Sequence, residues 1–145
     1  MQRWLGAAAA ALTIALAAPA SAQKDASSAV KVVYHLSEGN AQATNAIRNI
    51  RNHLTADPSA KIVVVTHANG VQFLLDGAID GNGAPFEAAV QDLKGKGVDF
   101  RVCRFTLERQ NIDPKKVIPE ASLVPSGVAE VSRLQFKEGF AYLRP

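Results

Sequence analysis

The run KIVVVTH at residues 61–67 is an almost continuous series of β-branched side chains. Such a run is typical of a strand that lies inside a parallel sheet and is covered by helices on both faces. Two further runs, VKVVYH at residues 30–35 and VDFRVC at residues 98–103, share this β-branched and aromatic character. Together, the three runs predict the central strands of an α/β fold.

The segments between and after these strands have the periodicity of helices. Apolar residues recur on one helix face from Ala43 onward, and this helix should end near Asp57 and Pro58. A second helix is expected to begin at Pro85 and to end at Gly95. Three shorter helices are predicted at residues 71–75, at residues 106–110 with Thr106 as the cap, and after a cap at Ser126.

Two connecting segments contain the glycine and asparagine residues that favour turns. Asn69 and Gly70 predict a turn after the central strand, and DGNG at residues 80–83 predicts a flexible loop. This loop is interpreted either as a mobile rim or as a simple connector.

Alternating strands and helices predict a three-layer α/β/α sandwich, because parallel neighbours need crossover connections. Weaker strand signals at residues 123–124 and 141–143 bring the mostly parallel sheet to about five strands. We expect one domain over residues 30–145, preceded by a flexible tether at residues 23–29. Ligand sites in such sheets lie beyond the carboxyl ends of the strands.

The amino-terminal segment, residues 1–22, has the pattern of a cleaved signal peptide. Arg3 precedes an apolar run over residues 5–18, and Ala-Ser-Ala at residues 20–22 supplies the small residues of a cleavage site. A membrane anchor is the alternative, but the run is shorter than the roughly 20 apolar residues that span a bilayer. We therefore expect a periplasmic protein that begins at Gln23 and keeps no stable membrane anchor.

The charge balance argues against nucleic acid as a partner. The formal net charge is +3, and removing the signal segment lowers it by one because Arg3 is the only charged residue there. Basic and acidic residues are interspersed, so no broad cationic stripe is predicted. The glycines match neither the GxGxxG nor the GxxxxGK pattern, which argues against the usual dinucleotide and phosphate loops.

Cys103 is the only cysteine in the chain, so it cannot form an internal disulfide. It ends a predicted strand, on the face that also carries Arg101. A cysteine in this position is a buried structural residue, an intermolecular link or a reactive thiol. Arg101, Arg104 and Arg109 are close in sequence and would favour the thiolate, as would the amide groups of a helix capped by Thr106.

Two histidines also end predicted strands, so the fold could bring His35, His67 and Cys103 to one edge of the sheet. There, a neutral imidazole would accept the thiol proton near neutral pH, although a hydrogen bond to a loop is the alternative role of each histidine. Two imidazoles and a thiolate are also competent zinc or copper ligands, but no short metal-binding spacing supports such a site. We therefore predict no metal, and we expect His53, on a helix among polar residues, to be solvated.

Two separated segments, GVDFRVCRFTL at residues 97–107 and VPSGVAE at residues 124–130, form a pattern together with Tyr142. This pattern resembles the DsrE/DsrF-like sulfur-relay family, and the resemblance covers residues 30–145. It implies an α/β subunit that assembles into trimers or hexamers. In that family the characteristic cysteine accepts sulfur and passes it on as a persulfide, a role that falls here on Cys103.

The resulting hypothesis is a periplasmic sulfur-binding or sulfurtransferase-like protein that needs no cofactor. Cys103 would attack a sulfane donor, Arg101 and Arg104 would stabilise the thiolate or persulfide, and His35 or His67 would accept the proton. Because no second cysteine is present, the donor and the acceptor must be other periplasmic molecules. The alternatives are a non-catalytic module of the same fold that binds a small ligand or serves in assembly, and a thiol redox sensor that forms an intermolecular disulfide.

Overall fold

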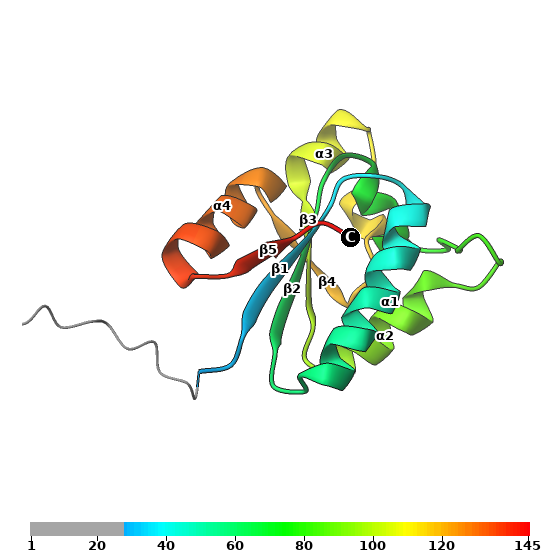
Figure 1. Cartoon of the computed structure of the whole chain (residues 1–145). Helices are drawn as coiled ribbons and strands as arrows, with labels where there is room; N and C mark the ends of the chain where they lie inside the picture. Colours follow the sequence, from blue (N-terminus) through cyan, green and yellow to red (C-terminus); the bar gives the residue numbers. More distant parts are fainter. Residues whose placement is uncertain (1–27) are drawn as a thin grey trace, which may run out of the picture.

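The computed structural model describes residues 28–145 (Figure 1), so the predicted signal peptide and most of the predicted tether lie outside the described residues. Strands and helices alternate along this part of the chain. No helix within it is long and apolar enough to cross a membrane. The elements, in chain order, are β1 (Lys31–Leu36), α1 (Asn40–Ala56), β2 (Lys61–Thr66), the 3-10 helix η1 (Ala68–Leu74), α2 (Phe86–Gly95), β3 (Asp99–Cys103), α3 (Arg104–Arg109), the 3-10 helix η2 (Pro114–Lys116), β4 (Ala121–Val124), α4 (Gly127–Glu138) and β5 (Ala141–Leu143).

The five strands form one sheet in the order β4-β3-β2-β1-β5, and every neighbouring pair is parallel. The β-branched run that begins at Lys61 supplies β2, the middle strand, which is buried from Ile62 to Thr66. The predicted α/β fold is therefore confirmed, with a sheet that is entirely rather than mostly parallel. The short strands β4 and β5, which have the weakest sequence signals, form the two edges.

Helices cover both faces of the sheet and make the predicted three layers (Figure 1). α1, α2 and η1 pack on one face over the larger core, which includes Phe73, Leu93 and Phe100. α4 packs on the other face, where Val131 and Leu134 join a smaller apolar core. The apolar core on the α4 face is the smaller of the two, and β5 and part of α4 are exposed.

The 3-10 helix η1 lies close against the end of β1, which corrects one sequence prediction. Asn69 and Gly70, predicted as a turn, lie inside this helix. A Cβ atom at Gly70 would come within 2.2 Å of the Leu36 carbonyl oxygen. Close backbone packing, rather than turn geometry, therefore requires glycine at this position.

α3 begins directly after β3, earlier than the sequence predicts. Cys103 occupies the N-cap position, and Arg104 is the first helical residue. Thr106 is buried and does not cap the helix, because its hydroxyl oxygen accepts a hydrogen bond from the Ala68 backbone N–H at 3.0 Å. The contact with η1 thus outweighs the local capping preference of threonine. Ser126, in contrast, caps α4 as predicted.

Candidate functional site

Three central strands end at one edge of the sheet, next to α3 and the start of α4 (Figure 1). His35 lies on β1, His67 follows β2 directly, and Cys103 ends β3. Thr66 pairs with Val102 in the parallel register, so His67 and Cys103 follow at the same level. The fold thus places these three sequence-predicted residues at the edge where ligand sites of parallel sheets lie.

Cys103 lines a cavity of about 300 Å³ at this edge. The residue is 5% exposed, so the cavity is its main contact with solvent. Phe105 and Val128 stand exposed at the same cavity, and Arg109 brings a positive charge to it. The lining residues come from the end of β2, from β3 and α3, and from the start of α4: His67, Cys103, Phe105, Thr106, Arg109, Ser126 and Val128.

Gly127 allows α4 to begin directly against this edge. A Cβ atom at this position would lie 3.0 Å from the Thr66 carbonyl oxygen, 3.1 Å from the His67 Cβ atom and 3.3 Å from the Cys103 Cβ atom. Any larger residue would press on all three neighbours at once. The absence of a side chain therefore brings the Gly127 backbone N–H close to the Cys103 sulfur.

The thiol of Cys103 is surrounded by hydrogen-bond donors. Burial raises its pKa, but the hydroxyl of Thr106 and the backbone N–H groups of Gly127, Thr106 and Phe105 lower it by more, so the pKa lies below its ordinary value. The Cys103 side chain makes no capping hydrogen bond at the start of α3 in the structure. The nearby donors favour the anion, because a thiolate is a much stronger acceptor than a thiol.

Arg101 is bound by two carboxylates. It donates to Asp99 at 2.7 and 2.9 Å and also to Glu130 of α4. Burial lowers the pKa of Arg101, but these pairs raise it by more. Neither Arg101 nor Arg104 is among the groups that shift the pKa of Cys103. Arg101 therefore joins β3 to α4, and this geometry gives no support to the idea that the two arginines stabilise the thiolate.

The two histidines stack, with ring centroids 4.8 Å apart. His35 Nδ1 lies 2.8 Å from the Tyr142 hydroxyl oxygen, with which it shares a hydrogen bond. Burial lowers the pKa of both rings, and the positive charge of Arg144 acts in the same direction. Both imidazoles are therefore neutral at pH 7 and able to accept a proton. Of the two, only His67 lines the Cys103 cavity, and His35 packs behind it.

Within residues 28–145, no three side chains of His, Cys, Asp or Glu are grouped to hold a metal ion. The alternative of a zinc or copper site at His35, His67 and Cys103 thus has no geometric basis in this part of the chain. His53 also differs from its prediction, because it is half-buried and its Nδ1 lies 3.0 Å from the Tyr34 hydroxyl oxygen. Tyr34 is buried in the sheet, and a buried tyrosine hydroxyl needs a partner.

Comparison with protein families matches residues 6–145 to the DsrE/DsrF-like family. The chain belongs to this family. A search of curated proteins finds no match. Among solved structures, the fold is similar to MTH1491, a protein of unknown function from Methanobacterium thermoautotrophicum, with a TM-score of 0.71 and 32% identity over 80% of this chain and 99% of that chain.

The ychN protein from E. coli also has this DsrE/DsrF-like fold, with a TM-score of 0.62. Its identity to this chain is 14%, over 81% of this chain and 98% of that chain, so the likeness supports the fold alone.

Two residues near Cys103 were not predicted as part of the candidate site. Thr106 was assigned to capping, and Gly127 was given no role beyond the family resemblance. Both carry groups that lower the pKa of the Cys103 thiol. The position of Gly127, directly after the predicted serine cap, was a usable signal. Glycine has a low helix propensity, so a glycine at a helix start indicates that another backbone or side chain packs closely there.

Proposed function

We propose that this DsrE/DsrF-like protein is a sulfur carrier, in which Cys103 accepts sulfane sulfur and holds it as a persulfide. The observation that carries the proposal is the set of donors around the sulfur, which lowers the pKa of the Cys103 thiol despite its burial. The adjoining cavity of about 300 Å³ offers space for a small donor. A thiolate that opens into a cavity is the form of cysteine that reacts.

Loading requires a donor that brings its own leaving group. With thiosulfate, the Cys103 thiolate attacks the outer sulfur, the S–S bond of the donor breaks, and sulfite leaves with the electron pair. The product is the persulfide anion, and no oxidant or reductant is consumed. His67 lines the same cavity and is neutral near pH 7, so it is suited to take the thiol proton before the attack.

The cavity also suits an anionic donor and an anionic product. Arg109 lines it and pairs with no carboxylate within residues 28–145. Its guanidinium is therefore available to the oxygens of thiosulfate or to the terminal sulfur of a persulfide. In this proposal Arg109 takes the electrostatic role that the sequence prediction gave to Arg101 and Arg104.

Unloading requires a thiol from another molecule, because Cys103 is the only cysteine in the chain. The acceptor thiolate attacks the outer sulfur of the persulfide, and Cys103 leaves as a thiolate. Phe105 and Val128, exposed at the cavity, would give a protein acceptor an apolar surface to contact.

We also propose that the protein works in the periplasm, with residues 1–22 as its export signal and with a periplasmic donor and acceptor. The support is the sequence pattern of Arg3, the apolar run and the small residues at positions 20–22. Expression of the full chain in a bacterium, followed by cell fractionation and amino-terminal sequencing, tests this. A soluble periplasmic product that begins at Gln23 is expected, whereas a cytoplasmic product with an intact amino terminus would contradict it.

The exposed surface of α4 and β5 is proposed to contact a second copy of the chain. Phe136 on α4 is 92% exposed, and Tyr142 and Leu143 on the edge strand β5 are also exposed. An edge strand beside exposed apolar side chains is a common site of association. Light scattering should give the mass of an oligomer for the wild type and a lower mass for Phe136→Glu, with Lys137→Ala as the control. A monomeric wild type would contradict the proposal.

A single-turnover assay tests the sulfur chemistry. The protein is mixed with thiosulfate, and the released sulfite is measured without a thiol acceptor. We expect a burst of sulfite equimolar with the chain, continued turnover only after an acceptor thiol is added, and no burst with the Cys103→Ser variant. An unchanged burst of sulfite in Cys103→Ser, or no burst with thiosulfate in the wild type, would favour the ligand-binding alternative.

A further inference from the structure

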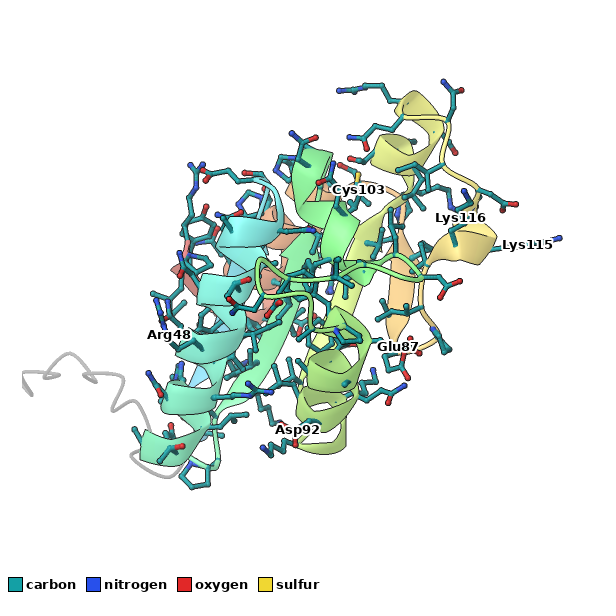
Figure 2. The ribbon with its side chains drawn as sticks, turned by 90° about the vertical axis from the view of Figure 1, so that its right-hand side faces the viewer. Arg48, Glu87, Asp92, Cys103, Lys115 and Lys116 are labelled. Atoms are coloured by element: carbon teal, nitrogen blue, oxygen red, sulfur yellow. The ribbon has the colours of Figure 1, made fainter. Side chains whose placement is uncertain are left out.

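A second cavity lies between α1, α2 and the loop that leads into α2. Its volume is about 410 Å³, within the range of about 300–1,000 Å³ that is usual for small-molecule sites. It shares no lining residue with the Cys103 cavity. Figure 2 faces α1 and α2 and shows Arg48 on α1, with Cys103 near the upper end of the molecule.

Part of the wall of this second cavity is apolar. Ala84 and Pro85 are exposed and Ala89 is half-buried at this cavity, which the buried side chains of Ile47 and Phe86 also line. Ala84, Pro85 and Ala89 offer a small surface on which a ring or a short hydrocarbon chain can pack. Removal of that surface from water would favour an apolar ligand.

The remaining wall on α1 is basic. Arg48 and Arg51 are three residues apart and therefore lie on one face of the helix. Arg48 donates to the amide oxygen of Asn45 at 3.0 Å, and no carboxylate within residues 28–145 pairs with it. Arg51 reaches Asp92 only at 3.9 Å, and that carboxylate is already bound by Lys96 at 3.0 Å. Both guanidinium groups thus have donors left for a ligand.

The loop supplies a fixed rim. Asp80 Oδ1 accepts hydrogen bonds from the backbone N–H groups of Asn82 at 2.8 Å and of Ala84 at 2.9 Å, so this carboxylate shapes the loop. The Asn40 side chain donates to the Ile79 carbonyl oxygen at 3.2 Å and ties the loop to α1. The glycine-rich segment 80–83, left open in the sequence as rim or connector, is part of this hydrogen-bonded rim.

We propose that this cavity binds a small organic carboxylate. The apolar part of the ligand packs on Pro85 and Ala89, and its carboxylate pairs with Arg48 and Arg51. A guanidinium group presents paired N–H donors that match the two oxygens of a carboxylate. An inorganic anion would leave the apolar wall unused, and a neutral apolar molecule would leave the arginines unpaired. The site is independent of the sulfur chemistry proposed for Cys103.

Nuclear magnetic resonance titration of the nitrogen-labelled protein with benzoate tests the proposal. Benzoate should give saturable shifts of amide signals in residues 44–51 and 80–89, whereas benzamide, which has the same ring without the charge, should bind much more weakly. The double variant Arg48→Gln, Arg51→Gln should lose at least about tenfold in benzoate affinity. The double variant Lys115→Gln, Lys116→Gln removes the same charge elsewhere on the surface (Figure 2) and should keep wild-type affinity.

A second variant separates ligand binding from any change in fold. Ala84→Glu places a carboxylate at the exposed rim without altering either arginine and should exclude benzoate. Four outcomes would overturn the proposal: equal binding of benzamide and benzoate, binding of inorganic phosphate as tight as that of benzoate, equal losses in the arginine and lysine variants, or no saturable shifts near the cavity.

Discussion

Replacement of Gly127 by alanine tests whether close packing of α4 controls the thiol. The added Cβ atom would lie 3.0 Å from the Thr66 carbonyl oxygen, 3.1 Å from the His67 Cβ atom and 3.3 Å from the Cys103 Cβ atom. None of these atoms sits at the end of a flexible side chain, so α4 itself must shift outward. Such a shift carries the Gly127 N–H away from the sulfur and should raise the pKa of the Cys103 thiol.

The expected magnitudes follow from these contacts. Overpacking costs about 1–3 kcal/mol, and alanine in place of a helical glycine contributes about 0.5–1 kcal/mol in the opposite direction. The free energy of unfolding should therefore fall by up to about 2.5 kcal/mol. Partial loss of one hydrogen bond to the thiolate should slow alkylation at pH 7 by about three- to tenfold.

The assay is the rate of iodoacetamide alkylation between pH 5 and 10, combined with urea unfolding. The matched control is Gly95→Ala, because a Cβ atom there would meet no other atom within 4 Å. The control should keep the wild-type alkylation profile and should be no less stable than the wild type, with a gain of up to about 1 kcal/mol from the loss of a helical glycine. If Gly127→Ala also keeps both, the packing of α4 against Cys103 does not set the reactivity of the thiol, and the reasoning is refuted.

Three further predictions concern the neighbours of Cys103. Thr106→Val removes the buried hydroxyl, so it should raise the pKa of the thiol and lower the unfolding free energy by about 1–3 kcal/mol, as measured by alkylation and urea unfolding. Arg101→Gln should destabilise the fold because it breaks the ion pairs with Asp99 and Glu130, yet it should leave the alkylation profile of Cys103 unchanged. Slower alkylation of this variant would show that Arg101 does stabilise the thiolate. Burial holds the pKa of His35 and His67 below the unfolded value of about 6.5. Unfolding exposes rings that bind protons more readily, so stability should fall as the pH drops below about 6.5, and the drop in urea midpoint from pH 7.5 to 5.5 should be smaller in His35→Gln; equal drops would contradict this.

The strands were predictable because each depends on a local pattern. The β-branched run of β2 is buried in the middle of the sheet, and the alternation in β3 correctly placed Arg101 and Cys103 on one face. Helix starts were less predictable, since they depend on contacts between distant residues. Thr106 has the side chain of a cap, but its partner is Ala68 on a different element, so α3 begins two residues before it, at Arg104.

The surroundings of the candidate site were predictable only in part. Parallel strands align their ends, which is why His35, His67 and Cys103 could be placed at one edge. Which groups face the sulfur depends on how α4 packs on the sheet, and no local pattern reports that. For the same reason, the sequence did not predict that Arg101 pairs with Glu130, 29 positions further along the chain.

The most direct test of the central claim is the intact mass of the protein after incubation with thiosulfate or polysulfide, recorded with and without a reductant. For the wild type, we predict the addition of whole sulfur atoms, located on Cys103 by fragmentation and removed by the reductant. The Cys103→Ser variant should gain nothing. A wild-type protein that gains no sulfur from either donor, or a variant that gains as much, would contradict the claim that Cys103 carries sulfur as a persulfide.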